Sequence, residues 1–310
     1  MAPFISVVSP VYMAEQIIPE LVKRIKEAFI DLTENYEIIL VDDCGPDNSW
    51  AAIQEECKKE KRVKGIKLSR NYGQHHAITA GVEHAKGDYI VVMDCDLQDN
   101  PKYIKDLYDS AVAGADIVFT YKESRNHSFL KNLSAAIFYR FYNYLLDNKK
   151  NNFDKNVGAY SLIKRKVANA FLQIKDQNRD YTFILGLLGF NKVYLPIQHD
   201  KRYKGKSSYN VAKLLKHAID GITSQSDKLL RLSISIGFIF FISSVIWTMR
   251  VVYVYLTDKV PPGYASLTII ELLGTGLILM SLGITGIYIG KIFEQVKQRP
   301  LYIIDSTVNI

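Results

Sequence analysis

Residues Gly87–Asp99 read GDYIVVMDCDLQD, an apolar run followed at once by three acids and an amide. The run Tyr89–Met93 predicts a strand that is buried on both faces of a parallel sheet. In open α/β sheets, ligands bind just beyond the carboxyl ends of the strands. Side chains two residues apart in an extended chain point the same way, so Asp94 and Asp96 offer two carboxylates to one ligand. Such a pair suits Mg²⁺ or Mn²⁺ with phosphate oxygens completing the shell, although a polar turn is the plainer alternative.

The sequence around this stretch alternates strand-like and helix-like segments with short links. Strands are expected over residues 4–12, 37–41, 63–68, 89–93 and 116–120, and helices over 15–31, 47–59, 74–85 and from 101 onward. This alternation predicts an α/β fold with a largely parallel sheet and helices on both faces. No Gly-x-Gly-x-x-Gly follows the first strand and no Gly-x-x-x-x-Gly-Lys occurs. Both a dinucleotide-binding fold and a P-loop ATPase are therefore disfavoured.

Composition narrows the class of protein. The 310 residues carry a net charge of +7 and are 48% hydrophobic. A basic balance indicates a phosphate-bearing substrate, anionic lipid or nucleic acid. The cysteines Cys44, Cys57 and Cys95 lack metal-ligand spacing, which disfavours zinc and a disulfide framework and suits a reducing compartment. The first residues lack the basic and apolar regions of a signal peptide, so the N-terminal part is expected in the cytoplasm.

A second predicted strand also ends in acids, at Asp42 and Asp43. Its carboxyl end should lie at the same edge of the sheet as Asp94 and Asp96. A carboxylate at the end of the second strand can accept from a ring N–H of a base or from ribose hydroxyls. The pair Asp94 and Asp96 can hold a metal ion on a diphosphate. The residues alone thus predict a nucleotide-diphosphate site.

Four motifs extend this pattern along the chain. They are SVVSPVY (Ser6–Tyr12), VDDCGPD (Val41–Asp47), LSRNYGQ (Leu68–Gln74) and MDCDLQDNP (Met93–Pro101). Together they resemble the family-2 glycosyltransferases with a GT-A fold, and within them the dolichol-phosphate mannose synthase and bactoprenyl-phosphate glucosyltransferase group. The resemblance covers nearly the whole chain. It implies a nucleotide-diphosphate sugar as donor, Mg²⁺ or Mn²⁺ as cofactor and polyisoprenyl phosphate as acceptor.

The resemblance also implies roles for single residues. Pro10, Tyr12 and Asp42 would line the nucleoside pocket, with Glu15 displaced by one residue from the usual acid of the family. Asp94 would face the ribose or the sugar diphosphate, and Asp96 and Gln98 would ligate the metal. Basic residues would offset the charge of donor and acceptor: Arg70, Lys122, Arg125, Arg202 and Lys206. Among the residues that resemble the family's, Asp94, Asp96 and Arg202 are expected to be catalytic.

Two positions depart from the family pattern. The loop Arg202–Tyr209 resembles Arg-x-x-Gly-x-Ser-Lys, but Ser208 replaces the final lysine. Ala159 stands where bacterial relatives often carry an acid. A lipid phosphate has a second pKa near 6, so it is already largely dianionic at pH 7 and needs positioning more than a base. A sugar hydroxyl would need a base, so the missing acid favours a phosphate acceptor.

Two apolar runs close the chain, at residues 232–256 and 267–289, and each exceeds the roughly 20 residues that span a bilayer. Basic residues flank their expected cytoplasmic ends: Lys228, Arg231, Lys291, Lys297 and Arg299. We therefore expect a cytoplasmic GT-A domain (1–228), a transmembrane hairpin (229–292) and a cytoplasmic tail (293–310). Segments near 128–146 and 209–226 are expected to be interfacial helices that contact membrane lipids.

The sequence thus predicts a multi-pass enzyme of the inner (plasma) membrane that transfers a sugar, with inversion, to polyisoprenyl (undecaprenyl) phosphate. Nucleic acid is not an expected partner, and homo-oligomerisation is left open. Two alternatives remain: a transferase that extends a lipid-linked glycan at a sugar hydroxyl, and a non-catalytic membrane scaffold of the same fold. The sequence names neither the sugar nor the nucleotide.

Overall fold

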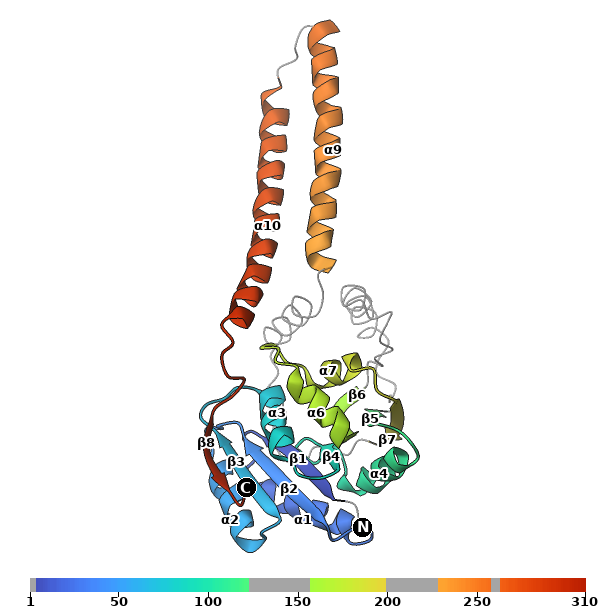
Figure 1. Cartoon of the computed structure of the whole chain (residues 1–310). Helices are drawn as coiled ribbons and strands as arrows, with labels where there is room; N and C mark the ends of the chain where they lie inside the picture. The colour runs from blue at the N-terminus through green and yellow to red at the C-terminus, as the bar shows by residue number, and fades with distance from the viewer. Residues whose placement is uncertain (1–3, 123–156, 199–227, 258–262) are drawn as a thin grey trace. The chain divides into compact units, whose positions relative to one another are not determined.

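The computed structural model describes residues 4–122, 157–198, 228–257 and 263–310. The chain divides into two units (Figure 1). An α/β unit comprises residues 1–126, 151–208 and 300–310. The second unit comprises residues 127–150 and 209–299 and is called the helical unit after the two long helices described in it. The last eleven residues therefore belong to the α/β unit although they follow the helical unit in sequence.

One mixed sheet of eight strands forms the centre of the α/β unit, in the order β7-β5-β6-β4-β1-β2-β3-β8. The strands are β1 (Ile5–Val11), β2 (Tyr36–Asp42), β3 (Val63–Leu68), β4 (Tyr89–Val92), β5 (Ile117–Lys122), β6 (Val157–Lys164), β7 (Lys192–Ile197) and β8 (Ile304–Val308). Strands β4, β1, β2 and β3 run parallel to one another, while β6 and β8 run antiparallel to their neighbours. The predicted α/β fold with a largely parallel sheet is confirmed.

Helices cover both faces of this sheet. They are α1 (Ile18–Phe29), α2 (Ser49–Lys59), α3 (Gln74–His84), the short 3₁₀ helix η1 (Pro101–Tyr103), α4 (Ile104–Val112), α6 (Arg165–Gln173) and α7 (Tyr181–Leu187). Alternate strand residues enter separate cores because strand side chains alternate between faces. Ile38 and Leu40 of β2 pack with α1, α2 and α4, whereas Ile39 and Val41 pack with α3, α6 and α7.

Small differences from the expected elements have local causes. Strand β1 continues one residue beyond Pro10, because the ladder to β4 already ends at Val8 and Pro10 pairs only with β2. Helix α2 begins at Ser49, two residues later than expected. The Asn48 side chain does not cap it, and the Asp47 carboxylate accepts hydrogen bonds from the Ser49 hydroxyl and the Glu15 backbone N–H. Strands β6, β7 and β8 were not expected as sheet members, because a local sequence pattern does not identify a distant strand partner.

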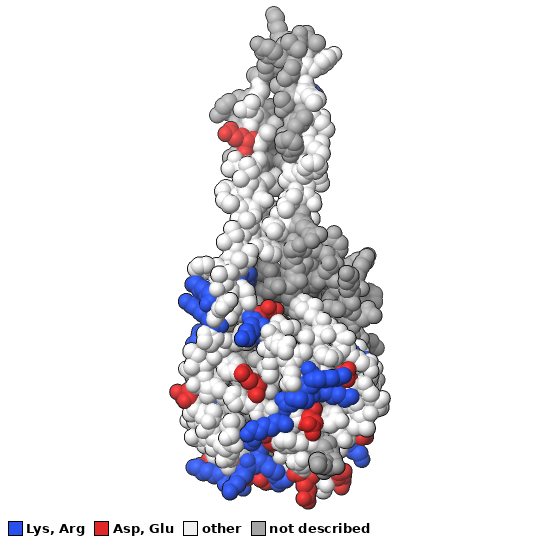
Figure 2. Space-filling model, in the orientation of Figure 1, with Lys and Arg blue, Asp and Glu red and all other residues white. Residues whose placement is uncertain are grey.

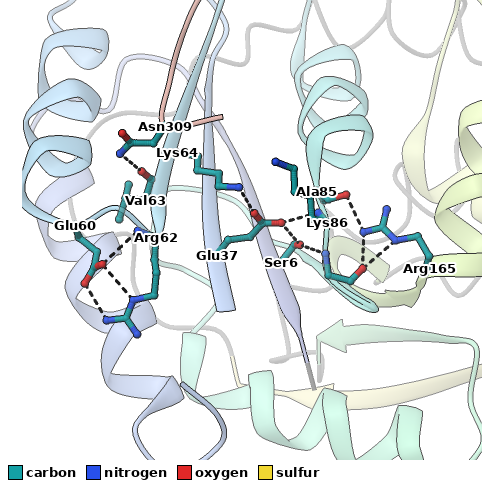
Figure 3. A network of polar contacts seen from close by, with 11 residues as sticks. Ser6, Glu37, Glu60, Arg62, Val63, Lys64, Ala85, Lys86, Arg165 and Asn309 are labelled. Atoms are coloured by element: carbon teal, nitrogen blue, oxygen red, sulfur yellow. Dashed lines mark hydrogen bonds and ion pairs between the residues drawn. The ribbon is translucent and has the colours of Figure 1, made fainter. Parts of the chain in front are cut away.

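A satisfied polar network lies at the amino ends of the central strands (Figure 3). The carboxylate of Glu37 accepts from the Ser6 hydroxyl at 2.6 Å, the Lys86 amide at 2.6 Å and the Lys64 ammonium at 2.5 Å. The Ser6 hydroxyl in turn accepts from the Gly87 amide. Burial by itself raises the pKa of Glu37, but these partners outweigh it and hold the pKa below its ordinary value. Both carboxylate oxygens of the buried Glu37 thus have donors at this end of the sheet.

The helical unit contains two long helices that contact each other, α9 (Lys228–Thr257) and α10 (Tyr264–Val296). Figure 2 shows charged side chains gathered on the α/β unit, whereas the described atoms of the long helices are mostly uncharged. Within the described residues, one segment is long and apolar enough to cross a membrane, Gly274–Val296. The two interfacial helices expected near 128–146 and 209–226 lie outside the described residues.

Candidate functional site

Four parallel strands end side by side at one edge of the sheet. In spatial order they are β4, β1, β2 and β3, and the residues that follow them carry most of the expected ligand-binding groups. Asp94 and Asp96 follow β4, Tyr12 follows β1, Asp42 ends β2 and Arg70 follows β3. The fold therefore brings together the acidic motifs that the sequence placed at one edge.

Asp42 is a buried acid at this edge. It pairs with Val11 in the β1–β2 ladder, is 2% exposed, and its Oδ1 has no hydrogen-bond partner within the described part of the chain. Burial raises the pKa of Asp42 to about 6, against the opposing effect of the Gly45 amide. A buried carboxylate oxygen without a donor costs free energy, so this atom is suited to a donor supplied by a ligand.

Asp43 takes a different role although it is adjacent. Its carboxylate accepts from the amides of Tyr72 at 2.7 Å and Gly73 at 2.9 Å. Because side chains alternate along a strand, Asp43 faces α3 while Asp42 faces the opposite side. Gly73 has a φ of +95°, a conformation that favours glycine, and its amide reaches Asp43 from the residue before α3. Asp43 therefore fixes the loop Ser69–Gly73, on which Arg70 lies with its guanidinium 4.4 Å from the Tyr72 ring centroid.

The carboxylates after β4 are also held in place. The side-chain amide of Gln74 donates to Asp94 Oδ1 at 2.6 Å, and the backbone N–H of Gln98 donates to Asp96 Oδ1 at 3.1 Å. Gly73 precedes α3 and Gln74 is its first residue. The start of α3 therefore contacts Asp43 after β2 through Gly73 and Asp94 after β4 through Gln74. The sequence analysis placed Gln74 at the end of the motif LSRNYGQ and Asp43 after a predicted strand, but it missed the hydrogen bonds that each side chain makes.

Three residues that are not glycine adopt a left-handed backbone at this edge. They are Met13 (φ 54°) after β1, Cys44 (φ 53°) after β2 and Leu97 (φ 59°) after β4. This conformation costs roughly 1–3 kcal/mol per residue and persists where the surrounding structure requires it. It occurs after three adjacent strands, so the surrounding structure constrains the loops at this edge, as is common at binding sites.

The residues present fit an open metal site better than a closed one. Within the described ranges, no group of three or more His, Cys, Asp or Glu side chains gathers as a metal site. Asp96 and the Gln98 side chain supply oxygen donors at the end of β4, with Asp94 beside them. Mg²⁺ is commonly held by one or two carboxylates plus substrate phosphates, and this donor set matches that arrangement.

The first turn of α3 also contacts the beginning of α7. His75 Nδ1 accepts from the Tyr181 amide at 3.1 Å, and its Nε2 lies 3.9 Å from the carboxylate of Asp180. Asp180 caps α7 by accepting from the Phe183 amide. His75 therefore packs and accepts a backbone N–H, as expected for a histidine that does not ligate a metal. On β6, Ala159 is half-buried, and its carbonyl accepts from the Ser161 hydroxyl.

The remaining expected residues divide between the described and undescribed parts. Pro10 is buried in β1, Tyr12 is 44% exposed, and Glu15 accepts from the Asn48 amide at 3.4 Å. Lys122 ends β5, and its side chain is outside what the structure describes. Arg125, Arg202 and Lys206 lie outside the described residues, as does Ser208. Their expected contacts with diphosphate or acceptor stay predictions.

Comparisons with known proteins agree with the resemblance seen in the motifs. A family model described as glycosyl transferase family 2 matches residues 6–172. The chain is 35% identical over 307 residues to the uncharacterised glycosyltransferase YkcC of Bacillus subtilis (strain 168), covering 98% of this chain and 94% of that protein. It is 30% identical over 310 residues to the undecaprenyl-phosphate 4-deoxy-4-formamido-L-arabinose transferase of Aeromonas hydrophila, covering 98% and 94%.

A solved structure is also similar. The mannosyltransferase PcManGT of Pyrobaculum calidifontis, in complex with GDP-Man and Mn²⁺, matches with a TM-score of 0.48 and 15% identity, covering 91% of this chain and 88% of that one.

Proposed function

Because the chain belongs to glycosyl transferase family 2 and is a glycosyltransferase, we propose that it transfers a sugar from a nucleotide-diphosphate donor to polyisoprenyl phosphate at a membrane. The observation that carries the donor half of this proposal is the unpaired Oδ1 of buried Asp42. An N–H of the nucleobase would supply the missing donor. The predicted family membership is thus confirmed, while the donor and acceptor named here are proposals.

The diphosphate would lie between the base at Asp42 and the acids after β4. Asp96 and Gln98 would hold Mg²⁺ or Mn²⁺, with Asp94 beside them, oriented by Gln74. When bound, the metal supplies positive charge that stabilises the leaving diphosphate. Arg70 would contact a phosphate from the β3 side, and Lys122, Arg125, Arg202 and Lys206 would neutralise the remaining charge.

The reaction would be a single displacement with inversion. A phosphate oxygen of the acceptor attacks the anomeric carbon of the sugar, and the bond from that carbon to the nucleoside diphosphate breaks. The electron pair leaves with the diphosphate. Ala159 provides no carboxylate, and a dianionic phosphate acceptor needs none, since it is nucleophilic without losing a proton.

The sheet itself supports a membrane hairpin. Strand β7 precedes the two long helices in sequence and β8 follows them, yet both strands belong to one sheet. A chain that leaves and rejoins one sheet must cross a membrane an even number of times. If Gly274–Val296 crosses, a second crossing is needed, and the 30-residue helix α9 is long enough at 1.5 Å per residue. We therefore propose two crossings, with the α/β unit on the cytoplasmic face.

Two other functions compete with this proposal. Transfer to the hydroxyl of a lipid-linked glycan would use the same donor site with a different acceptor. A non-catalytic scaffold would keep the fold without metal-dependent nucleotide binding, but the retained Asp94, Asp96 and Gln98 speak against it.

The decisive experiment is an assay of transfer from labelled nucleotide sugars to undecaprenyl phosphate by the full-length protein in detergent. Each donor is tested with and without Mn²⁺, beside Asp96→Ala. We expect a mild-acid-labile lipid product that needs the metal and falls at least about a hundred-fold in the variant. Glycosylation of lipid-linked oligosaccharide without transfer to the lipid phosphate would overturn the acceptor assignment. Absence of both transfer and nucleotide binding would favour the scaffold.

A further inference from the structure

The chain beyond the last long helix returns to the donor edge of the α/β unit. Strand β8 pairs antiparallel with β3, the strand that leads into the Ser69–Gly73 loop. Just before β8, the Ile303 carbonyl accepts from the Ser69 amide at 2.9 Å, and the Tyr302 hydroxyl donates to Glu83 of α3. Tyr302 and Ile304 also pack against the same core as Tyr72. The C-terminal segment thus contacts both the loop and the helix that follows it.

The pairing of β8 with β3 is irregular at the end nearest the loop. Lys67 pairs with Ser306 and Leu68 pairs with Ile304, so Asp305 is an extra residue in β8. Such a bulge bends the strand and changes where its residues point. The Asp305 carboxylate lies 3.6 Å from the Lys67 ammonium, which is the cation acting on Asp42. The bulge therefore lies where β3 leads into the Ser69–Gly73 loop.

The loop held in this way carries two groups of the donor site. Its amides at Tyr72 and Gly73 hold Asp43, and its Arg70 is the phosphate contact expected on this side. The Ser69 hydroxyl lies 3.2 Å from the Tyr72 hydroxyl, so the residue bonded to Ile303 also bonds within the loop. A continuous set of contacts leads from Tyr302 to Asp43.

We propose that the C-terminal segment Tyr302–Asn309 is a positioning element that holds the Ser69–Gly73 loop in the conformation that binds the donor. This inference rests on the proposed function, because it assumes that the edge binds a nucleotide diphosphate. It assigns a role in donor binding to residues that the sequence indicated only as a tail. It also makes donor binding depend on the segment directly after the long helix α10.

The two ends of the segment allow a matched comparison. Tyr302 adjoins Ile303, whose carbonyl accepts from the Ser69 amide, and the Tyr302 hydroxyl donates to Glu83 of α3. The Asn309 side chain donates to the Cys57 carbonyl at 2.8 Å and, as Figure 3 shows, to the Val63 carbonyl at 2.9 Å, at the opposite end of β3. Tyr302→Ala removes the bond to α3 and the core packing next to the Ile303–Ser69 hydrogen bond, and Asn309→Ala removes an anchor of the same segment away from the loop. Tyr302→Phe keeps the ring and loses only the hydroxyl.

Two measurements on the full-length protein in detergent test the proposal. Hydrogen–deuterium exchange is followed for the peptide covering residues 69–76, without ligand. Affinities for UDP, GDP and dTDP are measured by calorimetry with Mn²⁺. For Tyr302→Ala we expect faster exchange and a Kd raised about 5- to 20-fold for the nucleotide that binds, with a smaller change for Tyr302→Phe. Asn309→Ala should leave both quantities within about two-fold of the native protein.

The outcomes separate this inference from the function on which it rests. If the native protein binds a nucleotide and both alanine variants weaken binding in proportion to their loss of Tm, the segment is merely structural and the proposal is wrong. Unchanged exchange in Tyr302→Ala overturns it as well. If the native protein binds none of the nucleotides, the donor function fails, and the proposal fails with it.

Discussion

Strand β2 has a buried acid near each end, Glu37 and Asp42, and the two differ in their hydrogen-bond partners. Glu37 and Asp42 are both 2% exposed. Glu37 has donors from Ser6, Lys64 and Lys86 and a lowered pKa, while Asp42 has one oxygen without a partner among the described residues and a pKa raised to about 6. Burial is the same, so the difference lies in the partners. The partners of Glu37 stabilise the fold, whereas the Asp42 oxygen without a donor costs stability and is the atom that we propose a ligand pairs with.

The largest effect should come from a change at the Glu37 end of β2. Glu37→Ala leaves the Lys64 ammonium, whose side chain is 13% exposed, without its carboxylate. We expect the free energy of unfolding to fall by about 3–5 kcal/mol, measured by denaturant titration. Activity per folded molecule should stay unchanged, because these residues lie far along the strands from the donor edge.

A matched control separates this effect from a general loss of ion pairs. Glu55 pairs with Lys58 at 2.7 Å on the exposed face of α2. Glu55→Ala should leave the unfolding transition in place, since exposed pairs are screened by water and salt. Equal losses for Glu37→Ala and Glu55→Ala would contradict the stabilising role assigned to the amino end.

The next effect is expected at the Asp42 end of β2. Asp42→Asn should raise the KM for the nucleotide sugar about ten- to a hundred-fold, because a neutral amide replaces the charged acceptor of a base N–H. Stability at pH 7.5 should be retained, since the substitution removes a buried charge that lacks a full set of donors. A loss of stability as large as that of Glu37→Ala, with unchanged KM, would show that the two ends do not differ in function.

The raised pKa of Asp42 predicts a pH dependence with a definite sign. Above about pH 6 the folded protein holds Asp42 as a carboxylate, which accepts the base N–H; below it the proton weakens that acceptor. Because the pKa of Asp42 is higher in the folded than in the unfolded state, protonation of Asp42 favours folding below that pH. Weaker donor binding at low pH would therefore not come from unfolding caused by Asp42. We expect donor affinity to fall about ten-fold from pH 7.5 to pH 5. Asp42→Asn should remove this dependence.

The smallest effect should come from Gln74, which orients Asp94 through one hydrogen bond of 2.6 Å. Because the contact is exposed, water can replace part of it, and Gln74→Ala should lower kcat by about 2- to 10-fold. Gln74→Glu, which places a second carboxylate beside Asp94, should lower it further. A kcat equal to that of the native protein in both variants would remove Gln74 from the donor site.

Much of the α/β unit could be predicted from local pattern. Strands β1 to β4 and helices α1 to α4 follow from apolar runs and helical spacing, and parallel topology then gathers Asp42 and Asp94 at one edge. The position of β6 between β4 and β5 could not be predicted in this way, because strand pairing depends on packing between distant segments. The tail did carry a signal: Ile304, Ser306 and Val308 alternate with exposed residues, as one face of an edge strand does.

The site was predictable in residue type and less so in detail. Two adjacent acids end β2, and nothing in their identity says that Asp42 is left unpaired while Asp43 binds a loop. That difference follows from strand alternation and the position of α3. The left-handed backbone at Met13, Cys44 and Leu97 was also unpredictable, since none of these residue types favours it. The transmembrane hairpin expected from hydropathy has one candidate span within the described residues.

The last strand of the sheet is also the last to be synthesised. The open edge of β3 exists from the moment Leu68 leaves the ribosome, and its partner Ile304 follows roughly 235 residues later, which at about 5–20 residues per second takes on the order of 10 to 50 s. An unpaired edge strand is a template for wrong pairing. The nascent α/β unit therefore lacks its eighth strand while the long helices are made, and β8 pairs with β3 only after them.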